Sequence, residues 1–175
     1  MKGAPRWPLR LKACARGPPR ALVRPGLDIE TVIVESKLGI LRDRVLVGGR
    51  EIAVHRGRHG WRLVAVARGG VGRVQYDGWR DRLPIQSPSG SLEIRFRWRN
   101  TTFPWRGRIY RVGSMLGNRV TVFRGSEPVA VGKITWGGVR FEMMDPEFRD
   151  IEREFALGFG LRAQAIAVAV IASVH

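Results

Sequence analysis

The chain is poor in cysteine, histidine and acidic residues, and each shortage narrows what the protein can be. Cys14 is the only cysteine, which excludes an intramolecular disulfide and a metal site built from cysteines. This agrees with a reducing compartment such as the cytoplasm. Of the three histidines, His55 and His59 share a glycine-rich segment with no adjacent carboxylate. We therefore expect no metal and no other cofactor.

The shortage of carboxylates leaves a strong excess of positive charge. The sequence has 31 Lys and Arg against 15 Asp and Glu, a formal net charge of +16. Such a balance favours phosphate-bearing partners, whether nucleic acid, an anionic membrane surface or nucleotides. The other interpretation is a compositional bias towards arginine without a ligand. Residues 1–26 contain basic side chains, several prolines and no carboxylate, and we expect a flexible basic arm there.

Short alternating segments separated by glycine turns fill the chain from Leu27 to Met144. The clearest is RVLV followed by Gly48-Gly49 and REIAV, a pattern typical of a β-hairpin because glycine tolerates positive φ. Similar turns are expected at Gly69-Gly70, Gly117-Asn118, Gly125-Ser126 and Gly137-Gly138. About ten or eleven such segments predict an antiparallel meander, closed into a barrel or folded into a sandwich. SPSG, residues 87–90, is too irregular to assign.

The last thirty residues predict one apolar helix. Asp145 is a suitable N-cap and Pro146 a suitable first helical residue, and Arg162 is the only charge between Phe155 and Val174. A segment of about 20 such residues is long enough to cross a bilayer, or it is buried on every side within a protein. We expect a helix over residues 146–174, enclosed by strands as far as Ala167 and Val168.

The strand series from Ile29 to Met144 and the closing DIEREFALGFGLRAQAIAVAVIASV resemble the tubby C-terminal-like superfamily. Within it, the LURP-one-related proteins and the phospholipid scramblases are the most similar branch. The resemblance covers residues 27–175 and implies a single mainly-β domain, a closed antiparallel barrel of about 12 strands around a hydrophobic C-terminal helix. It also implies a non-catalytic module that binds an anionic ligand such as phospholipid headgroups. No lipid-site motif or calcium-binding loop of these families can be matched.

Arginines are the candidate ligand-binding residues. In SLEIRFRWRN, residues 91–100, strand alternation predicts an arginine row on one face and Phe96 and Trp98 in the core. Guanidinium groups present a fork of donors to phosphate oxygens, although such a row is also typical of a solvated outer face. The candidate anion-binding residues are Arg95, Arg97, Arg99, Arg106 and Arg108, with Arg56 and Arg58 in a second basic segment.

The sequence contains no arrangement that predicts catalysis, such as a nucleophile beside a base or paired carboxylates. We therefore expect a binding module rather than an enzyme, in the cytoplasm or at the periphery of a membrane. Two alternatives remain open: a nucleic-acid-binding protein that uses the basic arm and the arginine strands, and a tail-anchored membrane protein. The sequence specifies no protein partner.

Overall fold

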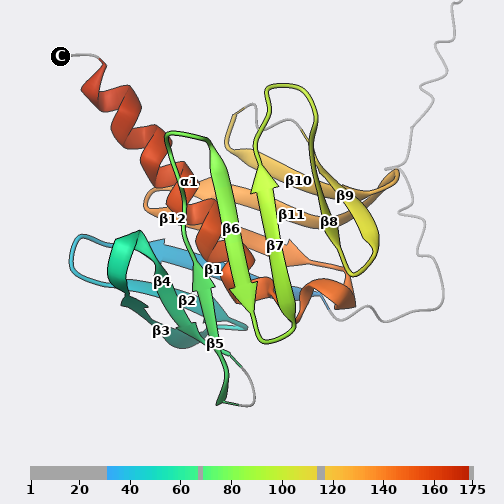
Figure 1. Ribbon diagram of the computed structural model, residues 1–175, viewed down its shortest axis with the longest axis horizontal. Helices are drawn as coiled ribbons and strands as arrows, with labels where there is room; N and C mark the ends of the chain where they lie inside the picture. The colour runs from blue at the N-terminus through green and yellow to red at the C-terminus, as the bar shows by residue number, and fades with distance from the viewer. Residues whose placement is uncertain (1–30, 67–68, 114–116, 174–175) are drawn as a thin grey trace, which may run out of the picture.

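A computed structural model describes residues 31–66, 69–113 and 117–173 (Figure 1). The predicted basic arm lies outside the described residues. The described strands are β1 (Val32–Leu38), β2 (Asp43–Val47), β3 (Arg50–Arg56), β4 (Arg62–Ala65), β5 (Val71–Val74), β6 (Arg82–Ser87), β7 (Gly90–Arg95), β8 (Thr101–Trp105), β9 (Arg108–Val112), β10 (Arg119–Arg124), β11 (Glu127–Thr135) and β12 (Gly138–Met143). Short 3-10 helices η1 (Arg58–Gly60) and η3 (Pro146–Phe148) and the helix α1 (Glu152–Ala172) complete the elements.

The strands form one antiparallel sheet that curls into a nearly closed barrel around α1 (Figure 1). Strands that follow one another in sequence pair with each other, except β7 and β8, and β1 pairs with β12, which joins the first and last strands. The two edges of the sheet are β7 and β8, so the barrel has a seam where these consecutive strands face each other. The predicted barrel with a central C-terminal helix is confirmed.

Glycine turns connect the hairpins much as the sequence predicts. Gly48 and Gly49 have φ of 54° and 81° and join β2 to β3, a conformation that favours glycine because it has no Cβ. The β11–β12 turn is instead made by Trp136-Gly137, one residue earlier than expected. This shift places the tryptophan at the tip of the turn.

Strands β6 and β8 have no counterpart among the predicted segments. Both contain a central proline, Pro84 or Pro104, and proline argues against a strand because it cannot donate a ladder hydrogen bond. Both are tolerated beside the seam: β8 is an edge strand, and β6 shares only a short ladder with β5. The unassigned SPSG segment is the β6–β7 turn with the strand ends that flank it.

The approach to the helix has two steps rather than one. Asp145 caps η3 by accepting a hydrogen bond from the Glu147 amide at 2.9 Å, and Pro146 is the first residue of that turn. The α-helix itself begins at Glu152, so the predicted continuous helix from residue 146 is wrong. The 3-10 turn lets the chain leave β12 and enter the barrel.

Aromatic rings from the strands and the helix fill the core. Phe155 and Phe159 of α1 lie 4.7 Å apart between ring centroids, and both contact Phe141 of β12. Phe148 packs edge-on against Tyr110 at 4.9 Å. Small residues fit the helix between the strands, because a Cβ at Gly158 would lie 2.7 Å from Leu83 atoms.

Candidate functional site

Only half of the apolar helix is inside the barrel. Every residue from Glu154 to Leu161 is buried, whereas Ile166, Val168, Val170 and Ile171 are 42–60% exposed. Figure 1 shows the C-terminal half of α1 leaving the barrel at the upper left. The expectation that strands enclose Ala167 and Val168 is therefore wrong, because the strands end one to two turns before these residues. By length and composition alone, α1 could cross a membrane.

We call the end where the helix emerges the exit end, and the opposite end the entry end. The exit end consists of the connections β1–β2, β3–β4, β5–β6, β7–β8, β9–β10 and β11–β12, since alternate connections of a meander lie at the same end. Gly160 identifies it: its Cα lies beside Ser36 and Leu38, at the end of β1 that leads into the first of these connections.

Arg162 marks the rim of the barrel, where the helix passes from protein to solvent. Its Nε and Nη2 donate to the two carboxylate oxygens of Asp81, each at 2.8 Å. Tyr76 also donates to Asp81, at 2.7 Å, and the guanidinium lies 4.1 Å from the Phe96 ring centroid. Burial acts to raise the pKa of Asp81, but the hydrogen bonds from Arg162 and Tyr76 outweigh it and lower that pKa. The single charge of the apolar segment is thus neutralised at the rim.

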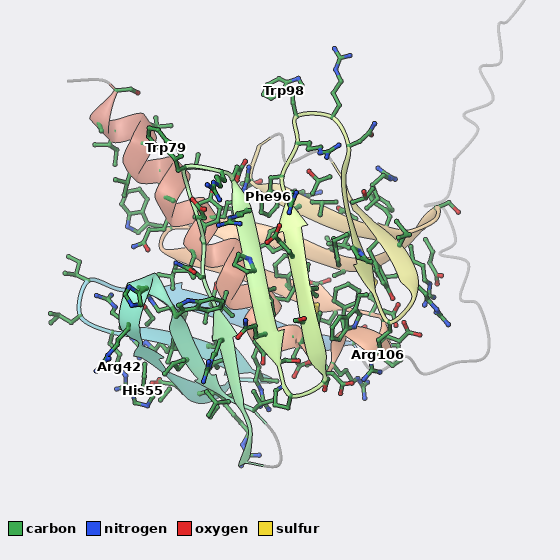
Figure 2. The ribbon with its side chains drawn as sticks, in the orientation of Figure 1. Arg42, His55, Trp79, Phe96, Trp98 and Arg106 are labelled. Carbon is green, nitrogen blue, oxygen red and sulfur yellow. The ribbon has the colours of Figure 1, made fainter. Side chains whose placement is uncertain are left out.

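Exposed apolar side chains gather at the exit end. Of the twelve large hydrophobic residues that are exposed in the described structure, nine lie there. They are Ile40, Leu41, Trp79, Trp98 and Trp136, each more than 90% exposed, and the four helix residues given above. Figure 2 shows Trp79 and Trp98 on the side of the emerging helix, away from Arg106 at the entry end. The prediction that Trp98 belongs to the core is wrong.

Trp98 is exposed because β7 is shorter than expected, and Trp79 and Trp136 are exposed because they lie in turns. β7 ends at Arg95, so Trp98 lies in the β7–β8 connection. Trp79 follows Gly78 in a turn, and Trp136 precedes Gly137. Sequence reasoning missed Trp79 and Trp136, although a tryptophan next to a glycine in a predicted turn is a usable sign of exposure.

The polar groups of the exit end are predominantly cationic. Exposed arginines there are Arg42, Arg58, Arg80, Arg97, Arg99 and Arg119. The described carboxylates at this end are each paired with arginine: Asp43 with Arg56 and Arg62, Asp77 with Arg82, and Asp81 with Arg162. Little negative charge therefore remains to oppose an anionic partner.

The predicted arginine row is dispersed. Arg95 is on β7 and pairs with Glu93, whereas Arg97 and Arg99 follow in the β7–β8 connection. A hollow of about 650 Å³ brings Arg97, Arg99 and Trp98 together with Ile166 of the helix. The prediction of one strand face is wrong, but two of its three arginines meet the apolar exit end.

The remaining candidates have other surroundings. Arg56 is ion-paired with Asp43 and also donates to the Gly39 carbonyl at 2.8 Å, which makes it a structural residue of the β1–β2 connection. Arg106 pairs with Asp150 and Arg108 with Glu147, both at the entry end. Arg58 lies in η1 at the exit end.

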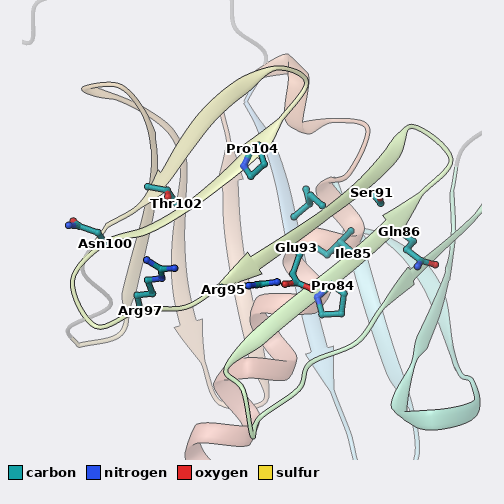
Figure 3. A pocket seen from close by; sticks show the side chains of 11 residues that line it. Pro84, Ile85, Gln86, Ser91, Glu93, Arg95, Arg97, Asn100, Thr102 and Pro104 are labelled. Atoms are coloured by element: carbon teal, nitrogen blue, oxygen red, sulfur yellow. The ribbon is translucent and has the colours of Figure 1, made fainter.

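A polar cleft of about 570 Å³ follows the seam between β7 and β8 (Figure 3). Arg95 and Arg97 line it, together with Thr102 and Pro104 of β8. The end of the cleft at Arg97 and Asn100 leads into the β7–β8 connection, so the cleft continues the cationic surface of the exit end. Among the described residues, no group of three or more His, Cys, Asp or Glu side chains is arranged to hold a metal ion.

Comparison of the chain with protein-family models, with curated protein sequences and with solved structures gave no match in any of the three.

Proposed function

We propose that this protein is a peripheral membrane module that docks on an anionic bilayer through its exit end. The observation that carries the proposal is the concentration of exposed apolar side chains at that one end, with the protruding half of α1 at its centre. Large apolar patches on a folded protein are typical of interaction surfaces. Together with the arginines around it, this patch favours a partner that has an apolar interior and an anionic surface, as an anionic bilayer does.

The length of the protruding helix favours insertion into one leaflet. Residues 163–172 extend about 15 Å beyond Arg162 at 1.5 Å per residue, about half of the ~30 Å hydrocarbon core. The Arg162–Asp81 pair would then lie at the level of the headgroups. Spanning the bilayer would instead require the buried half of α1 to leave the barrel and its aromatic core.

Tryptophan and arginine suit the interface around the helix. Tryptophan prefers the boundary between headgroups and hydrocarbon, where its ring is apolar and its N–H remains hydrated. Each arginine near an anionic surface contributes about 1 kcal/mol of attraction. The hollow that joins Arg97, Arg99, Trp98 and Ile166 offers phosphate donors beside an apolar wall.

The function expected from the family resemblance is consistent with this proposal. We propose a distant relation to the tubby C-terminal-like superfamily, supported by the shared plan of twelve antiparallel strands around a C-terminal helix. The proposed surface is derived from the exposed residues of this chain and does not rely on a family lipid site.

Flotation of the purified protein with liposomes tests the proposal. Vesicles of phosphatidylcholine alone are compared with vesicles containing phosphatidylserine, at about 0.15 M salt so that weak long-range attraction is screened. We expect flotation with the anionic vesicles. A variant with Val168, Val170 and Ile171 changed to serine, and a second with Trp79, Trp98 and Trp136 changed to alanine, should each reduce the bound fraction at least about tenfold, because each removes several kcal/mol of apolar transfer.

Val71 and Ile109 provide a matched control. They are 54% and 63% exposed but lie on the barrel wall, away from the exit end. Changing both to serine removes a similar kind of exposed apolar surface and should leave flotation unchanged. Equal losses in the control and the helix variant would contradict docking by the exit end. Binding to RNA or single-stranded DNA without flotation would instead favour the nucleic-acid alternative.

A further inference from the structure

A third cavity lies at the entry end, opposite the proposed membrane surface. It has a volume of about 550 Å³ and is lined by Val66 and Gly70, by Pro88 and Ser89 of the β6–β7 turn, and by residues at the start of α1. Its charged residues are Arg106, Arg149, Asp150, Arg153 and Glu154. Cavities of this size are in the range that binds small molecules.

Glu154 is the unusual residue of this cavity. Its side chain is fully buried, and neither carboxyl oxygen has a hydrogen-bond partner in any other described residue. The carboxyl rests against Gly72 of β5, where a Cβ would lie 2.0 Å from Oε1. The absence of a side chain at Gly72 is thus what makes room for the carboxyl. Burying such a group without a partner is costly, whether it is ionised or neutral.

A donor in the same wall is also unsatisfied. Arg153 precedes Glu154 on α1 and lines the cavity, and its Nη1 donates to the Ala65 carbonyl at 3.1 Å. Its buried Nε has no partner among the residues described. At the mouth, Arg106 and Asp150 neutralise each other as an ion pair. The wall of the cavity therefore contains one buried acceptor group and one buried donor group of opposite charge on adjacent residues.

We propose that this cavity binds a small zwitterion, a molecule with a primary amine and a carboxylate or phosphate a few bonds apart. The amine would donate to Glu154, and the anionic group would accept from Arg153. A simple anion would leave the Glu154 carboxyl without a hydrogen-bond partner. A simple amine would be repelled by the neighbouring arginines and would leave Nε of Arg153 without an acceptor. Free amino acids and amino-alcohol phosphates share this chemistry.

Proton release provides a readout that depends on Glu154. Burial, the largest cause, raises the pKa of Glu154 to about 7, and Glu152 and Asp150 act in the same direction, while the backbone N–H of Glu154 itself and the charge of Arg153 oppose them. Arg106 and Arg149 are the other charged groups around the cavity. An ammonium group that contacts the carboxyl favours its ionised form, so binding near pH 7 should release a proton.

Isothermal titration of the full chain with glycine, serine and phosphoethanolamine tests the proposal and separates the two ligand sources. Ethylammonium and inorganic phosphate are the fragment controls. We expect at least one zwitterion to bind at least about tenfold more tightly than either fragment. Titrations in buffers of different ionisation enthalpy should show proton release.

Two glutamine variants form a matched pair. Glu154→Gln should weaken zwitterion binding at least about tenfold and abolish proton release, because it removes the acceptor charge. Glu152 is also a buried carboxylate with an unpartnered oxygen on the same helix, but it does not line the cavity, so Glu152→Gln should bind normally. The proposal is overturned if phosphate alone binds as tightly, if no zwitterion binds, or if both variants lose binding equally. If Glu154→Gln does not fold, proton release by the unaltered chain decides.

Discussion

An aspartate placed in each half of α1 separates the enclosed part of the helix from the protruding part. Leu157 is fully buried, whereas Val168 is 60% exposed. Leu157→Asp loses about 2–5 kcal/mol of apolar packing and adds an unpaired buried charge that costs several kcal/mol more. The total is comparable to the ~5–15 kcal/mol that stabilises a typical domain, so this variant should not fold.

Val168→Asp should behave very differently. Full burial of a valine contributes about 1.5–3 kcal/mol, and Val168 retains less than half of that burial, so the expected loss is about 1 kcal/mol or less. An exposed carboxylate there also stays hydrated. Urea denaturation followed by circular dichroism gives the free energy of unfolding of each variant, with Leu157→Ala as the uncharged control. A barrel that unfolds when Val168 becomes aspartate would refute the conclusion that this half of the helix is outside it.

Three further predictions concern the rim, the buried carboxyl and the helix glycines. Asp81→Asn should lower the free energy of unfolding by about 1–3 kcal/mol at pH 7, because it removes the charged partner of Arg162. Since the folded pKa of Asp81 is lowered, the unaltered chain should lose its stability advantage over this variant as pH falls below about 4. Denaturation of both proteins at pH 7 and pH 3 measures this. The folded pKa of Glu154 is raised to about 7, so this carboxyl contributes stability at low pH that is lost as pH rises through that value. The free energy of unfolding of Glu154→Gln should therefore rise relative to that of the unaltered chain between pH 5 and pH 8, by about 3 kcal/mol. Urea denaturation at both pH values measures this, and a difference between the two proteins that is the same at pH 5 and pH 8 would contradict it. Gly158→Val should cost at least about 1–3 kcal/mol, because even a Cβ would lie 2.7 Å from Leu83 atoms; an unchanged melting temperature would show that the barrel yields there.

Most strands could be predicted from residue types that are close together along the chain. Gly48-Gly49 between alternating segments predicts the β2–β3 hairpin because positive φ is a property of glycine itself. Pro84 and Pro104 hide β6 and β8 for the same kind of reason, since proline normally disrupts a ladder. Their tolerance depends on lying beside the seam, which is a property of the whole sheet. The two strands that the sequence did not predict therefore lie beside the seam, where the barrel is incomplete.

The candidate site was only partly accessible from the sequence. Arg97 and Arg99 were chosen because guanidinium binds phosphate, and they do lie at the exit end, but β7 ends before either residue. Arg56 was chosen on the same basis, yet the buried carboxylate of Asp43 holds it. Composition alone does not show whether an arginine is free or ion-paired, because the carboxylate that pairs with it comes from a different strand.

By itself, the sequence determined the antiparallel hairpins, the apolar C-terminal helix and the excess of positive charge, since each depends on residue type and on neighbours close along the chain. Tertiary structure alone decided how far the strands enclose that helix. The barrel wall ends near Leu161, and the same alanines and valines that would be buried one turn earlier become an exposed surface. It also decided that Trp79, Trp98 and Trp136 gather around this surface while Glu154 is buried at the other end. Burial depends on which segments meet in space, and no local pattern carries that information.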